Sequence, residues 1–418
     1  MDDSQLKHYF PPDLTKPNNL SVNYEKYISR DLTVDEHIDA LLDALICIRE
    51  REQEQGDGEK EQNATSMTQA NFICYRGLLT KIMCTPYARN EPWEMGATLY
   101  NGSIYIEEHV SAEKRENAAG HNDRHKLMSY WGYRFETICN ISKPISELRR
   151  IGKTNTRKRS APSQLSGDGQ ERGGNDSPQS KVSKLEDGVD GSSESQKRDE
   201  ESNKTSNRQV AAVVQEEEEE NNEEEVDDLT TMTGQIDLED PELTGRLDGI
   251  VDTNLQYCTV ARTKIGSNSI IMGAEVDCTS EPKKAPPHNP LSNYIELKTS
   301  RVISNAREQN SFERHKLLKF WAQSFLPGIP TIIVGFRDDD GNVITVENFK
   351  TMEIPRLDTT ICINFLDAVL NFLRKQIKID NPNISYTIRW APPYKAIEVE
   401  YKGESTSFLT DRFLKSQK

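Results

Sequence analysis

Apolar and polar residues alternate along eight stretches of the chain, and this period of two is typical of strands with one buried face. The stretches are residues 72–84, 96–107, 255–265, 269–277, 331–336, 343–346, 384–390 and 396–401. Turn sequences that favour tight hairpins interrupt or join several of them: Asn101-Gly102 lies within residues 96–107, and Gly266-Ser267-Asn268 lies between two stretches. The sequence therefore predicts mixed sheets that are largely antiparallel.

Four other stretches, residues 33–54, 127–139, 312–325 and 365–377, show the spacing of helices instead. In the first of them, for example, apolar residues recur every three or four positions, which is the spacing of one helix face. The helices are expected to flank the sheets. The predicted fold class is therefore α+β.

One long segment has neither pattern. Between residues 145 and 230, Gly, Ser, Asn and Gln separate runs of charge, and residues 215–228 alone carry ten Asp and Glu. Such a composition cannot bury enough apolar surface to offset the entropy of the chain. We therefore predict a single catalytic domain made of residues 1–144 and 231–418, interrupted by a disordered charged insert at residues 145–230.

The composition narrows the class of protein. The 418 residues carry a formal net charge of −16, which argues against a broad basic groove for duplex nucleic acid. The sequence contains no run of 18 apolar residues, so neither a membrane span nor a membrane partner is expected. Seven scattered cysteines are expected to be reduced thiols in a nuclear or cytoplasmic protein. The basic cluster at residues 149–159 favours nuclear import, although it is also consistent with a solvated run of charge.

Two polar motifs stand at the ends of apolar stretches. Glu275 and Asp277 are two residues apart, as are Glu296 and Lys298, so each pair would point to one side of its strand. If the segment between Asp277 and Glu296 is a turn, three carboxylates and one ammonium converge. Carboxylate oxygens suit Mg²⁺ or Mn²⁺, and burying them together is costly unless a cation neutralises them. This is the D…ExK arrangement of metal-dependent phosphodiesterases, although charges on a solvent-facing strand give the same pattern.

Four further residues are candidates. Glu136, on the helix predicted at 127–139, would either complete a metal shell or lie on the surface. Arg76 lies in an apolar stretch and needs an anionic partner, either a structural carboxylate or a substrate phosphate. Gly77 beside it would let a ligand approach the backbone closely. Gln323 would hold a base, a ribose or a water, or it is a satisfied amide of the core.

Taken together, these motifs resemble the DXO family of RNA 5′-end decapping nucleases. The motifs that carry the likeness lie at residues 75–87, 132–136, 254–262, 273–278, 294–300 and 314–328. The resemblance covers residues 5–143 and 250–418, and it implies a D…ExK nuclease-like core. Members of the family usually carry a further N-terminal segment with a substrate-contacting arginine, and the match begins downstream of it.

The resemblance implies roles for individual residues. One or two divalent cations, Mg²⁺ or Mn²⁺, would be held by Glu136, Glu275, Asp277, Glu296 and the backbone carbonyl of Leu297. The substrate would contact Glu36, Tyr75, Arg76, Gly77, Cys258, Glu275, Lys298 and Gln323. Catalysis would depend on Glu136, Asp277, Glu296 and Lys298, with the lysine positioning a water or the scissile phosphate.

The resemblance also implies the reaction. The protein is expected to be a hydrolase in RNA quality control that acts on the 5′ end of single-stranded RNA. It would remove pyrophosphate from triphosphate ends, excise incomplete caps or whole nicotinamide dinucleotide caps, and digest RNA from the 5′ end. The alternative is a non-enzymatic or weakly active subunit that stabilises a larger 5′→3′ exoribonuclease, which is a candidate partner in either case. A DNA exonuclease of the wider D…ExK group is a third interpretation.

Overall fold

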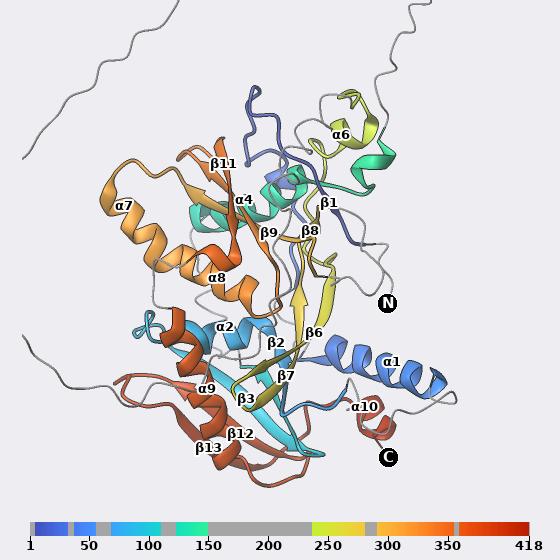
Figure 1. The fold of residues 1–418 in the computed structure, drawn as a ribbon, viewed down its shortest axis with the longest axis vertical. Helices are drawn as coiled ribbons and strands as arrows, with labels where there is room; N and C mark the ends of the chain where they lie inside the picture. Colours follow the sequence, from blue (N-terminus) through green and yellow to red (C-terminus); the bar gives the residue numbers. More distant parts are fainter. Residues whose placement is uncertain are drawn as a thin grey trace, which may run out of the picture. The chain divides into compact units, whose positions relative to one another are not determined.

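The computed structural model describes residues 5–31, 37–55, 68–109, 123–148, 236–280, 291–354 and 359–417. Nearly all of them belong to one compact unit, which spans residues 1–149 and 237–418. Two mixed sheets and the helices packed on them build this unit (Figure 1), which confirms the predicted α+β class. Ile145 and Leu148 are buried in it, so the unit reaches slightly beyond the predicted boundary at residue 144. The rest of the predicted insert, to residue 230, lies outside the described residues.

The larger sheet has seven strands, and β2 in its interior runs parallel to both of its neighbours. In spatial order the strands are β13 (Glu398–Glu404), β12 (Ile384–Trp390), β3 (Trp93–Tyr100), β4 (Ser103–Glu108), β2 (Phe72–Tyr75), β7 (Asn268–Glu275) and β6 (Cys258–Ile265). The β3–β4 hairpin turns at Asn101 and Gly102, whose φ angles of 49° and 76° suit this dipeptide. Because β2 and β7 are parallel, both strands end at the same edge of the sheet.

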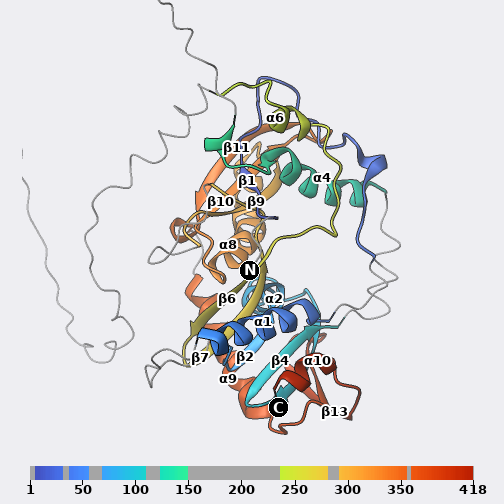
Figure 2. The same ribbon diagram turned by 90° about the vertical axis from the view of Figure 1, so that its right-hand side faces the viewer.

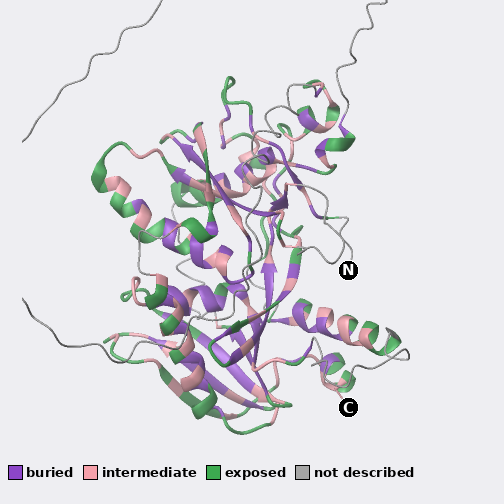
Figure 3. Ribbon diagram, viewed as in Figure 1, coloured by how far each residue is buried: buried purple, intermediate pink, exposed green. Residues whose placement is uncertain are grey.

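Alternate residues of the central strands face two helical layers. Phe72 and Met272 pack against α2 (Arg76–Cys84) and α9 (Thr359–Gln376). Ile73 and Ile271 point the other way, toward α1 (Asp39–Gln55) and α10 (Asp411–Ser416). Both faces of this sheet are therefore covered by helices, and Figure 3 shows the buried positions following its central strands.

The second sheet has six strands. In spatial order they are β11 (Val343–Lys350), β10 (Thr331–Arg337), β9 (Tyr294–Arg301), β8 (Cys278–Thr279), β1 (His8–Tyr9) and β5 (Asn140–Ile141). One face packs against α4 (Asp123–Cys139), since Leu297 and Ile333 share a core cluster with Phe135 of that helix. Short helical turns complete the described fold: η1 (Tyr24–Lys26), η2 (Ile145–Glu147), α6 (Pro241–Gly245) and η4 (Thr351–Glu353).

The other face of the second sheet carries one continuous helical segment, longer than the helix predicted at 312–325. It consists of α7 (Ala306–Ser311), the π-helical turn η3 (Phe312–Leu317) and α8 (Leu318–Phe325). A π-helical turn is wider than an α-helical one and changes which side chains face the core. Phe312 in η3 packs on β10, whereas Trp321 in α8 packs with α2. The views in Figures 1 and 2 accordingly show α2 and α8 between the two sheets.

Three predictions about strands are wrong. The stretch at 255–265 begins too early, because β6 starts at Cys258 and residues 255–257 form a loop. Residues 72–84 are not one strand, because the chain turns into α2 at Arg76. Leu78, Leu79, Ile82 and Met83 are all buried, and their spacing is that of one helix face. The stretch at 269–277 also ends early: β7 stops at Glu275, and the chain then crosses to β8 in the other sheet.

All seven cysteines lie in the described part of the chain as free thiols, five of them buried. None of the described helices is both long enough and apolar enough to cross a bilayer.

The contact between α4 and β10 predicts a pair of opposite mutational effects. A methyl group added at Gly335 would clash with the ring of Phe135, so Gly335→Ala should lower the free energy of unfolding by about 1–3 kcal/mol. Gly132 lies on the same helix as Phe135, and a methyl group there meets no described atom within 4 Å. Gly132→Ala should therefore stabilise the protein by about 0.5–1 kcal/mol, because alanine favours the helix. Urea unfolding of both variants measures these changes in the free energy of unfolding. Equal unfolding midpoints for the two variants would contradict the predicted opposite effects.

Candidate active site between the two sheets

The site lies where the chain passes from one sheet to the other. β7 ends at Glu275, and three residues later Cys278 opens β8 of the second sheet. Backbone contacts fix this crossing: the Val276 amide donates to the Tyr257 carbonyl over 3.0 Å, and Asn140 donates to the Asp277 carbonyl over 3.1 Å. Glu275 and Asp277 therefore come together at a sheet junction, rather than along one strand as predicted.

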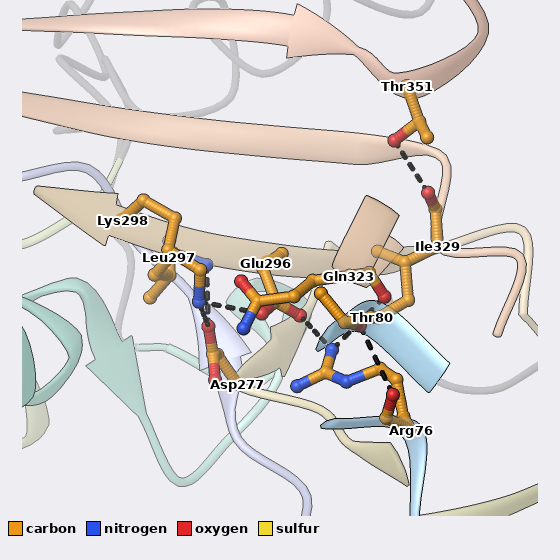
Figure 4. A network of polar contacts seen from close by, with 9 residues as sticks. All are labelled: Arg76, Thr80, Asp277, Glu296, Leu297, Lys298, Gln323, Ile329 and Thr351. Carbon is orange, nitrogen blue, oxygen red and sulfur yellow. Dashed lines mark hydrogen bonds and ion pairs between the residues drawn. The ribbon is translucent and has the colours of Figure 1, made fainter. Parts of the chain in front are cut away.

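Strand β9 brings the second motif to the same place. The Glu296 side chain is 1% exposed, and its Oε1 lies 2.6 Å from Nζ of Lys298. The same ammonium is 3.9 Å from Oδ2 of Asp277. That carboxylate also accepts a hydrogen bond of 2.6 Å from the backbone amide of Leu297. Figure 4 shows these side chains converging from β9 and from the segment after β7.

Arg76, the first residue of α2, contacts the cluster of Asp277, Glu296 and Lys298 from a third element. Its Nη1 donates to Oε2 of Glu296 over 2.9 Å and to the backbone carbonyl of Gln323 on α8 over 3.3 Å (Figure 4). In the structure the anionic partner of Arg76 is thus a carboxylate of the protein. Glu296 is held between two cations, Lys298 and Arg76.

Burial dominates the electrostatics of the four acids. Burial raises the pKa of Asp277 to about 7, although Lys298 opposes the shift. Burial, followed by the charge of Asp277, raises the pKa of Glu136 well above its usual range, and burial also raises the pKa of Glu275. Glu296 is the exception: burial acts to raise its pKa too, but Lys298 and Arg76 hold the pKa below its ordinary value. Four acids thus share two cations at a largely buried site, and this excess of negative charge favours a further cation.

The donor set fits a hard divalent cation. It consists of oxygen atoms, and Oε1 of Glu296 is buried without a hydrogen bond of good geometry despite its contact with Lys298. The Leu297 amide points to Asp277, and in an extended strand the carbonyl of the same residue faces the same side. Within the described part of the chain, no three acidic, histidine or cysteine side chains already surround one point as ligands. Lys298 lies between Asp277 and Glu296, so a bound cation would displace its ammonium from the carboxylates.

The structure places most of the predicted substrate positions at one edge of the seven-stranded sheet. Tyr75 is the last residue of β2, and Gly77 lies in the first turn of α2 with open space beside its Cα. Cys258 begins β6 directly opposite Glu275 of β7. Gln323 lies on α8, where its backbone contacts Arg76. Glu36 lies outside the described residues.

Sequence reasoning missed a pocket beside the acids. It has a volume of about 430 Å³, and Glu136, Glu275 and Asp277 form part of its wall. The segment 250–257 supplies another part. Leu255 in this segment is 72% exposed, and a bulky apolar residue within a polar loop is the signal that could have drawn attention to it.

Comparison with known proteins identifies relatives of this chain. A family model described as RAI1 like PD-(D/E)XK nuclease matches residues 1–164 and 192–414. Decapping nuclease RAI1 of Neurospora crassa is 30% identical over 98% of this chain and 76% of its own length. Decapping and exoribonuclease protein of Homo sapiens is 28% identical over 94% of this chain and 74% of its own.

Solved structures show the same fold. Scheffersomyces stipitis Rai1, and Candida albicans Rai1 in complex with pU5-Mn²⁺, each match with a TM-score of 0.68 and 21% identity. Each match covers 99% of this chain and 90% of the solved one.

Removing one of the two cations that pair with Glu296 should cause a large loss of stability. Arg76→Ala leaves a buried carboxylate with one cation fewer, and should lower the free energy of unfolding by about 3 kcal/mol. Arg412→Ala is the control, because Arg412 pairs with Asp43 on the surface over 3.1 Å and such pairs contribute little. Urea unfolding of the cation-free protein measures both. Equal midpoints for the two variants would show that Arg76 does not stabilise Glu296.

Proposed function

The chain belongs to the RAI1-like PD-(D/E)XK nuclease family, and we propose on this basis that it hydrolyses phosphate bonds at the 5′ end of single-stranded RNA. The observation that carries the proposal is the buried group of Asp277, Glu296 and Lys298, with Arg76 beside it. Acids of this kind at the junction of two sheets are costly for folding, so a role in chemistry explains them better than a structural role.

The proposed substrates are triphosphate ends, incomplete caps and nicotinamide caps, in the setting of RNA quality control. The names of the relatives support this choice, since two of them are a decapping nuclease and a decapping and exoribonuclease protein. The Candida albicans relative was solved with pU5 and Mn²⁺, which are an RNA 5′ end and a divalent cation. Digestion of RNA from the 5′ end would follow from the same site.

The proposed mechanism assigns a task to each residue. Glu136, Glu275, Asp277, Glu296 and the Leu297 carbonyl would hold the cation. Bound Mg²⁺ or Mn²⁺ supplies a Lewis acid that activates water and stabilises charge on the phosphate. Lys298, once released from the carboxylates, orients the attacking water or the scissile phosphate.

Arg76 and Gln323 would position the RNA. Arg76 has five N–H donors and holds Glu296 through one nitrogen, so its guanidinium can bind a phosphate oxygen at the same time. Gln323 lies next to it on α8 and would contact the 5′ nucleotide. Tyr75, Gly77 and Cys258 extend this surface along the edge of the sheet.

The proposal is tested by end-group analysis. RNAs that carry a triphosphate, an unmethylated cap, a methylated cap or a nicotinamide cap are incubated with the protein and Mn²⁺, and the released molecule is identified. Asp277→Ala combined with Glu296→Ala removes two acids of the site and should reduce product formation by roughly 10³-fold or more. The double variant Asp43→Ala with Glu398→Ala removes two surface acids and should remain active. An active Asp277/Glu296 variant would refute the proposal, and cleavage of matched single-stranded DNA at an equal rate would refute the choice of RNA.

A large 5′→3′ exoribonuclease is the proposed protein partner, as the family resemblance suggests. Co-purification with a tagged copy of this chain tests it. The Asp277→Ala/Glu296→Ala variant should retain the partner, because the side chains of Asp277 and Glu296 are only 5% and 1% exposed and offer little surface for docking. Recovery of the chain without a large exoribonuclease would argue against this partner. We propose a nuclear location, supported by the basic cluster at residues 149–159, which lies outside the described residues.

A further inference from the structure

The larger sheet carries a second pocket, which is separate from the acids. Thr68 and Gln69 of its wall come shortly before β2, whereas Arg76 of the active site directly follows that strand. Ser103, also in the wall, begins β4, which runs parallel to β2. The pocket and the active site therefore lie at opposite ends of these strands. The volume of the pocket, about 300 Å³, is at the lower end of the range of small-molecule sites.

The floor of this second pocket belongs to the hydrophobic core. Helices α1 and α10 pack side by side on one face of the larger sheet (Figure 2). Leu45 of α1, Tyr105 of β4 and Phe413 of α10 are buried in one core cluster there, and all three line the pocket. The rings of Tyr105 and Phe413 meet edge to face, with their centroids 5.7 Å apart. An apolar floor is thus in place before any ligand binds.

Arg49 is the one charged residue in the wall of the second pocket. This half-buried side chain donates from Nη1 to the backbone carbonyl of Ser416, at the end of α10, over 3.3 Å. Among the described residues, no carboxylate pairs with its guanidinium. The Asp380 carboxylate, beside the β3–β4 turn, accepts instead from the backbone amides of Asn101 and Gly102 over 2.8 and 2.9 Å. The charge of Arg49 and most of its N–H donors are therefore available to a ligand.

The remaining wall residues are uncharged and rich in hydrogen-bond donors. Gln69, Asn101 and Gln417 contribute side-chain amides, and Thr68 and Ser103 contribute hydroxyl groups. The side-chain amides of Gln69 and Asn101 make no hydrogen bond to another described residue. Because no carboxylate lines the pocket, an anion that enters it would not be repelled.

The single positive charge of the wall selects the kind of anion. One guanidinium balances one negative charge, whereas the second charge of a phosphate monoester would find no cation in the wall. Since Nη1 of Arg49 already binds a carbonyl, the Nε–Nη2 edge of the guanidinium is left for a ligand. Such an edge matches a planar group with two oxygens, as in arginine–carboxylate pairs. The geometry therefore favours a carboxylate over a phosphate.

We propose that the second pocket binds a small carboxylic acid with an apolar body. The carboxylate lies on Arg49 and on the neighbouring amides, and the body lies against Leu45, Tyr105 and Phe413. A free acid carries this group, and so does the C-terminal residue of a peptide. The proposal does not depend on the proposed function, because the wall contains no residue of the active site and binding is measured without RNA.

Isothermal titration calorimetry of the full chain tests the proposal with four compounds that share a branched apolar body: isocaproate, its uncharged amide, isoamyl phosphate and N-acetyl-leucine. Isocaproate should bind more tightly than its amide and than the phosphate. Arg49→Gln should weaken the binding of isocaproate by roughly tenfold or more, because it removes hydrogen bonds to a charged group. Arg412→Gln is the matched control and should bind like the wild type, because Arg412 lies on α10 outside the pocket wall and pairs with Asp43 over 3.1 Å.

Binding of isocaproate that Arg49→Gln weakens and Arg412→Gln retains supports the proposal. Tighter binding of N-acetyl-leucine then identifies a peptide terminus as the source of the carboxylate, and weaker binding identifies a free acid. The proposal is overturned if neither carboxylate binds, if the amide or the phosphate binds as tightly, or if both arginine variants bind alike. The urea unfolding midpoint shows whether Arg49→Gln is folded. If it is not, Gln69→Ala, at an exposed position of the wall, takes its place, and unchanged binding in that variant overturns the proposal.

Discussion

The ion pairs of one buried carboxylate hold the centre of this molecule together. Glu296, on a strand of the smaller sheet, is bound on one side by Lys298 of its own strand and on the other by Arg76. Arg76 begins the helix that continues from β2 of the larger sheet, and it also reaches the backbone of α8. Three layers thus meet at one side chain. A buried carboxylate without both cations would be strongly unfavourable, so the sheets and the two helices between them are constrained to this arrangement.

The need to neutralise buried carboxylates also explains why the site favours binding of a divalent cation. Lys298 neutralises the acids when no metal is bound, which allows the fold to form around an excess of carboxylates. Burial, and after it the charge of the neighbouring acids, still raises the pKa values of Asp277, Glu136 and Glu275 despite the opposing effect of Lys298. A divalent cation would relieve the remaining repulsion and free the ammonium for chemistry. The same charged residues, the acids of the site and Lys298, therefore determine both stability and function.

Much of this arrangement could be predicted from the sequence, because it depends on local patterns. The hairpin at Asn101 and Gly102 and the D…ExK residues all carry their signal within a few positions. Helix α2 was mistaken for a strand, since its apolar residues directly continue those of β2 and only their spacing distinguishes the two. The crossing after Glu275 could not be foreseen either: alternation reports that a residue faces one side of a strand, but not which sheet the strand joins. The pocket wall at Leu255 depends on contacts with Ile28 and Val276, which are distant in sequence.

The π-helical turn at Phe312–Leu317 has a consequence for insertions and deletions in this chain. Each residue of an α-helix advances the helix by about 100°. A deletion within η3 that restored ordinary α-helical winding would therefore rotate the whole of α8 by that angle relative to α7. Trp321 would leave its place against α2, and another carbonyl would replace that of Gln323 beside Arg76. The number of residues in η3 determines how far α8 is rotated about its axis relative to α7. Insertion or deletion of one residue here should therefore disturb the fold far more than most substitutions.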